Sequence, residues 1–438
     1  MPSYAAVLRP PHARRTFGAA LIGRLSYGTV SLSLVLAVKD ASGSFALAGT
    51  AMALFGATSV CLSPARAALV DRYGPRRALI PMAGCYAALL LVLAAATRHP
   101  GTSPPLIAAL AVAAGAGTPP LGPTMRTLWR RLVPGRELLQ SAYSLDGVAE
   151  ELLHVAGPLL VGALVICAAP SVGVAVSALL VLAGTLAMVT SPVAADPHRE
   201  SAGSPPGGLR PAGPEAGPYA TGPAGVGPRW PRQPVVVAAG VGLALGGVDL
   251  LVVADAGQHG QPGAVAWVLA ALSGGSVAGG LVNGAVAWRA PARLRLALLA
   301  AGLGLTLAGA GLAPDLPVLA AAAALAGLFV APALTTAYLI ADESAAPNAR
   351  TRAGAWVNTA VNAGSTGGTA AVGVLVGRVP LALCFALVAA PALLSAASAL
   401  PVLPGRIRIS RLRINRLRIS RRRRGLRRRA GAGSGART

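Results

Sequence analysis

Residues 71–80 read DRYGPRRALI and separate two long apolar segments of the chain. This stretch groups one carboxylate, three arginines and a glycine, although only 12% of the 438 residues are charged. Charges grouped between apolar segments are typical of a loop at a membrane surface, and a glycine gives such a loop the backbone freedom for a tight turn. We therefore expect a short turn between two membrane helices, built from Asp71, Arg72, Gly74, Arg76 and Arg77.

The whole sequence is too apolar to supply the polar surface of a soluble protein of this length. Hydrophobic residues make up 54% of it, and its mean hydropathy is +0.63. Twelve segments approach the about 20 residues that cross a bilayer. They are 17–38, 44–64, 78–97, 104–124, 138–168, 171–190, 234–256, 263–287, 294–313, 316–340, 353–376 and 381–402. We expect an all-α membrane protein with twelve transmembrane helices in two pseudo-repeated six-helix bundles.

The stretch between the sixth and seventh segments is rich in Pro, Gly and Ala and contains SAGSPPGGLRPAGPEAGP. Such a composition cannot build a core and is typical of a flexible linker. The C-terminus repeats R-[IL]-R-I-[SN] and then runs into arginine blocks. We expect residues 1–190 to form an N-terminal bundle, 191–233 a cytoplasmic linker, 234–402 a C-terminal bundle and 403–438 a low-complexity cytoplasmic tail.

Basic residues are distributed unevenly between the two sets of predicted loops. If both termini are cytoplasmic, the basic residues counted in cytoplasmic loops include Arg66, Arg126, Arg130 and Arg295. Those in the loops on the other side are Lys39, Arg98 and Arg378. Positively charged loops remain on the cytoplasmic side, so we expect a multi-pass protein of the plasma membrane with both termini inside. The tail would then meet anionic lipids. Because no aromatic residues are interleaved with its arginines, we expect no nucleic-acid partner.

The loop of the opening stretch resembles the signature G-x-x-x-D-R-x-G-R-R of the major facilitator superfamily. Ala67 replaces the first glycine, and Pro75 stands where a basic residue is usual. The resemblance implies a secondary transporter that works by alternating access, and a conformational-switch role for the loop. A purely topological role for its arginines is the alternative. The second half echoes the loop with Gly279, Gly280 and Gly284 but has no acid there.

The segment 138–168 contains GPLLVG, with Gly157, Pro158 and Gly162. It resembles the Gly-Pro-x-x-Gly-Gly element of drug–proton antiporters of this superfamily, and the chain as a whole resembles actinobacterial drug or metabolite antiporters. The match is partial, because Val161 replaces one glycine. The resemblance implies export. The alternative is a motif for helix packing, which requires the same small residues.

Ionisable residues inside a membrane helix are costly and therefore mark candidate functional sites. Asp146, Glu150 and His154 are spaced i, i+4, i+8 and spread across roughly 80° of one helix face. This stripe can carry protons, and Glu150 is the first candidate for proton coupling. The adjacent Glu151 is expected to point well away from the stripe. The alternative is a static network that ties the segment to Arg24, a buried arginine that needs a carboxylate partner.

The second half offers fewer polar groups within its apolar segments. Asp249 lies near the middle of its segment without a basic neighbour in sequence, which makes it a candidate for protonation or for a cationic substrate group. Asn358 and Asn362 are i, i+4 neighbours that can hydrogen-bond a substrate. Polar contact between helices is the alternative for this pair.

No G-x-x-x-x-G-K-[ST] loop occurs, which excludes an ATP-driven pump within this chain. The four cysteines have no metal-ligand spacing. We therefore expect no enzyme activity, no metal and no cofactor, and a monomer that binds a small-molecule substrate and protons. The preferred function is proton-coupled efflux of a drug-like or metabolite compound. The alternatives are proton-coupled or facilitative uptake of a small metabolite, or a non-transporting receptor or scaffold.

Overall fold

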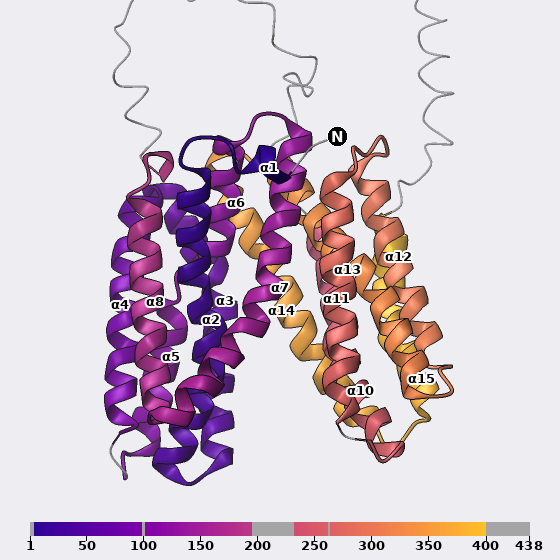
Figure 1. Ribbon diagram of the computed structural model, residues 1–438, viewed down its shortest axis with the longest axis horizontal. Coiled ribbons are helices and arrows are strands. Elements are labelled where there is room, and N and C mark those ends of the chain that lie inside the picture. Colours follow the sequence, from indigo (N-terminus) through magenta and orange to yellow (C-terminus); the bar gives the residue numbers. More distant parts are fainter. Residues whose placement is uncertain (1–3, 99–100, 195–231, 262, 400–438) are drawn as a thin grey trace, which may run out of the picture. The chain divides into compact units, whose positions relative to one another are not determined.

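The computed structural model describes residues 4–98, 101–194, 232–261 and 263–399, and these residues form helices joined by turns (Figure 1). The first half comprises α1 (Tyr4–Val7), α2 (Ala13–Ser42), α3 (Phe45–Tyr73), α4 (Pro75–Ala96), α5 (Pro104–Gly117), α6 (Leu121–Leu132), α7 (Arg136–Cys167), α8 (Pro170–Val189) and the 3₁₀ turn η1 (Pro192–Ala194). The second half comprises α10 (Arg232–Gln258), α11 (Ala264–Ala285), α12 (Ala292–Ala310), α13 (Leu316–Ser344), η2 (Pro347–Ala349), α14 (Arg350–Leu375) and α15 (Leu381–Ala399).

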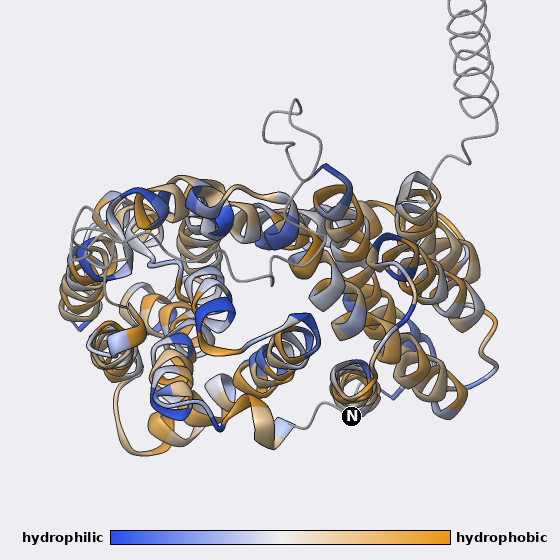
Figure 2. Cartoon of the chain, turned by 90° about the horizontal axis from the view of Figure 1, so that it is seen from above, coloured by the Kyte–Doolittle hydropathy of each residue, from blue (hydrophilic) through white to orange (hydrophobic). Residues whose placement is uncertain are grey.

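In the described part of the chain, 11 helical spans are long and apolar enough to cross a membrane, with α5 and α6 taken as one. The 26-residue α14 is not among them; it begins with Arg350 and Arg352, and asparagine, glycine, serine and threonine residues interrupt its apolar sequence. Hydrophobic residues predominate along the helices, as the view from above shows (Figure 2). The expected all-α membrane protein is confirmed. Its division at 190, 233 and 402 stays a prediction, and most of the linker and the whole tail lie outside the described residues.

The fourth predicted segment is interrupted, which sequence periodicity did not indicate. Residues 118–120 read TPP, and the prolines supply no amide hydrogen to continue α5. The carbonyls freed at this break find other donors. Arg66 Nη1 donates to the carbonyls of Gly115 and Ala116 at 3.1 and 2.9 Å, and the Tyr27 hydroxyl donates to the carbonyl of Pro119. The chain then starts α6, which carries Arg126 into the protein interior.

Arg66 was expected in a surface loop, and the structure corrects this. Its side chain is buried within α3, and Nη2 also donates to the Ser59 carbonyl at 2.5 Å. Three carbonyl acceptors stabilise the buried guanidinium without a carboxylate. Arg295 was expected in a loop for the same reason, but it too is buried, in the first turn of α12.

Close helix contact explains one of the predicted glycines. A Cβ at Gly157 of α7 would lie 2.5 Å from the backbone carbon of Gly28 on α2, so both positions need glycine for the helices to approach. A Cβ at Gly162 would meet nothing within 4 Å. Pro158 lies within α7 and is exposed. Gly157 therefore packs α7 onto α2, whereas Gly162 has no such role.

Candidate functional site

A cavity of about 230 Å³ lies between the two halves of the chain. Its first wall is polar and comes from α6 and α7: Arg126, Tyr143, Gly147, Glu150, Glu151 and His154. Its second wall comes from α10, α13 and α14 and is largely apolar, with Leu245, Val330, Ala331, Leu334, Thr335, Tyr338, Asn358, Val361 and Asn362. A cavity of this kind suits a small compound that has an apolar and a polar side.

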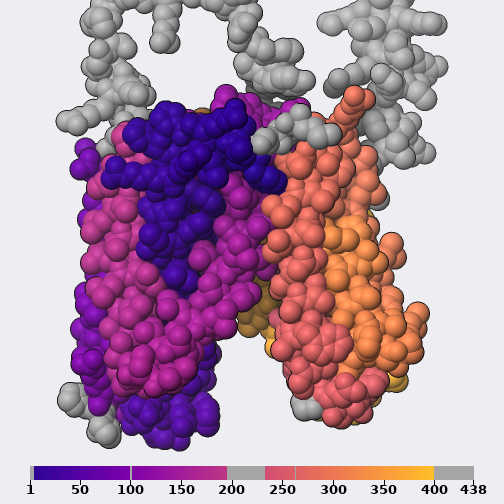
Figure 3. All heavy atoms as spheres, in the orientation of Figure 1, coloured from indigo at the N-terminus to yellow at the C-terminus, as the bar shows by residue number. Residues whose placement is uncertain are grey.

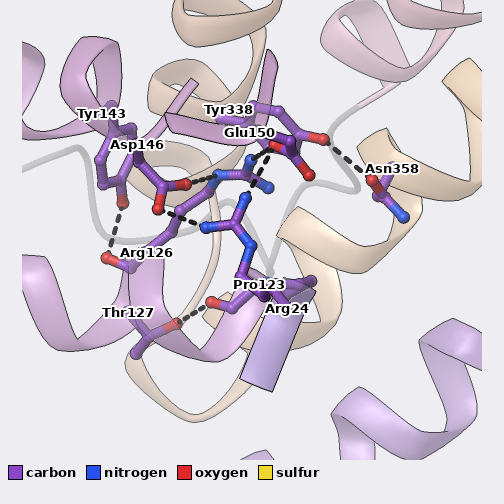
Figure 4. A network of polar contacts seen from close by, with 9 residues as sticks. All are labelled: Arg24, Pro123, Arg126, Thr127, Tyr143, Asp146, Glu150, Tyr338 and Asn358. Atoms are coloured by element: carbon purple, nitrogen blue, oxygen red, sulfur yellow. Dashed lines mark hydrogen bonds and ion pairs between the residues drawn. The ribbon is translucent and has the colours of Figure 1, made fainter. Parts of the chain in front are cut away.

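Four charged side chains meet at the polar wall of the cavity: Arg24, Arg126, Asp146 and Glu150 (Figure 4). Because α7 presents Asp146 and Glu150 one turn apart, both carboxylates reach the same two guanidinium groups. Arg24 of α2 lies 2.7 Å from Asp146 Oδ1 and 3.1 Å from Glu150 Oε2. Arg126 of α6 lies 3.0 Å from Asp146 Oδ2 and 2.7 Å from Glu150 Oε2. The two cations and two carboxylates therefore compensate one another.

The arginines of this cluster are largely buried, although Arg126 also lines the cavity. The side chains of Arg24 and Arg126 are only 3% and 6% exposed, whereas Glu150 is 35% exposed. The ring of Tyr338, from the second half, lies 3.7 Å from the Arg126 guanidinium. The hydroxyl of Tyr143 donates to the carbonyl of Arg126. Glu150 is thus the most exposed member of the cluster on the cavity side.

The other predicted cavity residues are also found near this site. His154 is exposed, and its Nδ1 lies 2.8 Å from the Glu150 carbonyl, so the other ring nitrogen faces away from the helix backbone. Tyr338 donates to Asn358 Oδ1 at 3.3 Å, and Asn362 donates to the Asn358 carbonyl at 2.8 Å. The two asparagines therefore contact each other within α14, and Asn358 also contacts α13.

Asp249 is exposed and lies on α10, one turn from the cavity-lining Leu245. Because positions 245 and 249 are one turn apart, Asp249 shares the side of α10 that carries Leu245. The same helix packs closely on α14 through Gly242 and Gly246. Within the described residues, Asp249 has no hydrogen-bond or ion-pair partner. It does not line the cavity itself.

Three residues of the site were missed by sequence analysis. Arg126 was counted as a loop residue, because the broken helix that buries it was not foreseen. Tyr338 comes from a helix 20 residues before Asn358 in the sequence, and only the tertiary fold brings its ring over Arg126. Glu151 was expected to point away from the Asp146–His154 stripe, yet it lines the same cavity.

The two halves contact each other at one end (Figure 3), and the hydrogen bonds of Asp71 place its loop there. Asp71 accepts hydrogen bonds from the backbone amides of Thr351 at 3.0 Å and Arg352 at 2.8 Å, in the first turn of α14. Arg130 Nε donates to Asp342 Oδ2 at 2.6 Å. These bonds link α3 and α6 to α14 and α13.

The turn of the opening stretch has the expected geometry. Gly74 adopts φ 83°, a conformation that favours glycine, between α3 and α4. Pro75 occupies the first turn of α4, where its missing amide hydrogen costs nothing. Arg72 is exposed and lies 5.2 Å from the Tyr73 ring centroid. Arg76 and Arg77 are also exposed.

A second set of contacts joins α7 to α11 at the same end. Gln140 Nε2 donates to the carbonyl of Asn283 at 2.7 Å, and Ser141 donates to the carbonyl of Gly284 at 2.5 Å. Asn283 Nδ2 donates to Ser144 Oγ at 3.0 Å. In the sequence echo of the loop, Asn283 follows Gly279 at the spacing that separates Asp71 from Ala67. The pseudo-repeat therefore places contacts between the halves at both loops.

The sequence matches the family model of the Major Facilitator Superfamily over residues 16–253, more than half of the chain. The chain belongs to this superfamily. It is accordingly a multi-pass membrane transporter and not an enzyme. The sequence matches no curated protein.

Solved structures of transporters share the fold. The human organic anion transporter MFSD10 is 16% identical, with a TM-score of 0.65, over 90% of this chain and 100% of that one. A bacterial homologue of the iron transporter ferroportin in an outward-facing state is 12% identical, with a TM-score of 0.65, over 88% of this chain and 96% of that one. At these identities the likeness concerns the fold alone.

Proposed function

We propose that the protein exports small amphipathic cations across the plasma membrane in exchange for protons. The observation that carries the proposal is the distribution of charge around the cavity. Arg24 and Arg126 are both compensated by carboxylates, so neither is left for an anionic substrate. Glu151 and Asp249 form no ion pair with an arginine or lysine within the described residues. An amine can compensate such a carboxylate, and so can a proton.

The two walls of the cavity support the amphipathic part of this substrate class. Leu245, Val330 and Leu334 offer apolar contact, and the α7 carboxylates lie opposite. Asn358 and Asn362 add amide groups that can hydrogen-bond a polar substituent. No group of three or more metal-ligating side chains occurs in the described part of the chain. An organic cation therefore fits this donor set better than a metal ion does.

The direction of export rests on the orientation that the basic loops predict. Lys39, Arg98 and Arg378 occupy the end opposite the Asp71 loop. With the arginine-rich end in the cytoplasm, the contacts between the halves close the cytoplasmic side, and the cavity faces outward. Protons would enter from outside and displace the exported compound. We expect a monomer with residues 1–190 and 234–402 as its moving halves, and a tail that meets anionic lipids.

Uptake of a small metabolite is the alternative within the same fold, because the cavity chemistry does not depend on direction. A receptor or scaffold that transports nothing is disfavoured by the family. The partial Gly-Pro motif favours export, and this inference stays a prediction.

The proposal is tested with the full-length protein in vesicles that contain a pH-sensitive dye. Small hydrophobic amines, zwitterions and carboxylates are added in turn as radiolabelled compounds, so that their uptake is measured beside the dye signal, with protein-free vesicles as the control. We expect amines to drive proton movement and carboxylates to have no effect. Transport of carboxylates alone would contradict the substrate class. Amine transport without proton movement would contradict coupling and leave a facilitative carrier.

A further inference from the structure

Glu151 and Ser276 form a hydrogen bond between the two halves of the chain beside the cavity. Glu151 lies on α7, and Ser276 lies on α11 of the second half. The Ser276 hydroxyl donates to Glu151 Oε1 at 2.9 Å. Ser276 is 2% exposed, whereas Glu151 is half-buried and lines the cavity. The carboxylate is therefore reachable from the cavity while one of its oxygens holds the opposite half.

The charged neighbours of Glu151 differ from those of Glu150. Two arginines bind Glu150 at 3.1 and 2.7 Å and keep it in the ionised form. Glu151 has no such ion pair in the described part of the chain. The groups that act on it are Ser276 on α11 and His154 and Glu150 on its own helix. Arg126 on α6 and Tyr338 on α13 line the same cavity. Of the two adjacent carboxylates, Glu151 is the one that can exchange its charge for a proton without breaking an ion pair.

We propose that Glu151, rather than Glu150, is the residue whose protonation is coupled to the movement of the two halves, through its bond to Ser276. This rests on the proposed function, in which protons exchange for substrate. The ionised carboxylate accepts a strong hydrogen bond from Ser276 and holds α7 beside α11. Protonation weakens the acceptor and loosens this link. Glu150 then serves to hold Arg24 and Arg126 in place.

The experiment measures the distance between the halves without any substrate. Spin labels are attached at Lys39→Cys and Arg378→Cys, both exposed at the end of the molecule opposite the Asp71 loop. The remaining cysteines, Cys61, Cys85, Cys167 and Cys384, are replaced by serine or alanine. The full chain is placed in nanodiscs, and the distance distribution is recorded from pH 5 to pH 9. We expect the ratio of the two distance populations to change about tenfold over this range, as for a typical coupling between sites.

Substitutions assign this change to a residue. Glu151→Gln should abolish the pH dependence, Glu151→Asp should retain it, and Ser276→Ala should reduce its amplitude. Glu137→Gln, an exposed acid at the start of the same helix, is the matched control and should behave as the unsubstituted protein does. Glu150→Gln and His154→Asn should both retain the pH dependence.

The outcomes separate this inference from the proposed function. A pH dependence that persists in Glu151→Gln, or that disappears in Glu150→Gln or His154→Asn instead, overturns the assignment to Glu151 and leaves proton coupling intact. An unsubstituted protein whose distances do not respond to pH contradicts proton coupling together with the assignment.

Discussion

The carboxylate of Asp71 accepts a hydrogen bond of 3.0 Å from the backbone amide of Thr351, which lies 280 residues later in the chain. The amide of Arg352 donates to the second oxygen at 2.8 Å. Asp71 thus satisfies free amide groups in the first turn of α14 and adds a negative charge where the helix dipole favours one. Opening this end of the transporter must break both bonds.

Asp71→Asn should therefore favour the state in which this end is open. Loss of the charge at a helix N-terminus costs about 1 kcal/mol, or about fivefold in the ratio of the two states. The ratio is measured from spin-label distances across the Asp71 end. Arg72→Gln is the control, because Arg72 is exposed and its guanidinium lies over the ring of the neighbouring Tyr73. Equal effects at both positions would mean that the loop only fixes the topology of the chain in the membrane.

Arg130→Gln should also disturb the closed end, whereas a purely topological role for this arginine predicts no effect there. Arg130 donates to Asp342 of the other half at 2.6 Å, and the Asp342 side chain is only 7% exposed. A double-mutant cycle with Asp342→Asn should give a coupling of about 1 kcal/mol in the same distance measurement. Additive effects of the two substitutions would show that the ion pair does not hold the halves together.

Asp146→Asn should destabilise the folded protein strongly. The side chain is 0% exposed and contacts both Arg24 and Arg126. Removal of one carboxylate leaves a buried charge uncompensated, which typically costs about 3–5 kcal/mol. Thermal unfolding of the purified protein in detergent measures the loss. The exposed Glu137→Gln on the same helix should leave the unfolding temperature unchanged. A stable Asp146→Asn variant would mean that the cluster is not a structural network.

Gly157→Ala and Gly162→Ala test which glycine of the Gly-Pro motif packs α7 against α2. The added methyl group at Gly157 would lie 2.5 Å from the Gly28 backbone, whereas Gly162 has open space around it. We expect a loss of about 1–3 kcal/mol of stability at Gly157 and almost none at Gly162. Unfolding temperatures test this directly. If the order is reversed, α7 does not pack on α2 through these glycines.

The fold was largely predictable, because apolar segments and the asymmetry of basic residues are local signals. The pairing of Arg24 was predictable too, since a buried arginine needs a carboxylate and the segment 138–168 offered several. The ends of helices were harder. Counting charges assigns an arginine near an apolar segment to a loop, and this was wrong for Arg66, Arg126 and Arg295. Backbone carbonyls bind Arg66 in the protein interior, carboxylates bind Arg126, and the side-chain amide oxygen of Gln140 binds Arg295.

The second wall of the site was beyond sequence reasoning for a different reason. Helix periodicity predicts which side chains share a face of one helix, but not what faces them. Tyr338 contacts Arg126 and Ser276 contacts Glu151 only because the two halves meet there. Glu151 was expected to point away from the Asp146–His154 stripe, yet the cavity extends around more than one face of α7.

The most direct test of alternating access is the accessibility of Asn362→Cys, an exposed position in the cavity. The exposed Cys61, Cys85 and Cys167 are first replaced by serine. A second pair, Thr127→Cys and Thr351→Cys, replaces two short side chains whose Oγ1 atoms lie 3.2 Å apart at the closed end, so that a disulfide can lock it. We expect a membrane-impermeant thiol reagent to label residue 362 from both sides of the membrane before cross-linking, and only from the side opposite the lock afterwards. Labelling from one side alone before cross-linking, or from both sides after it, would contradict the account.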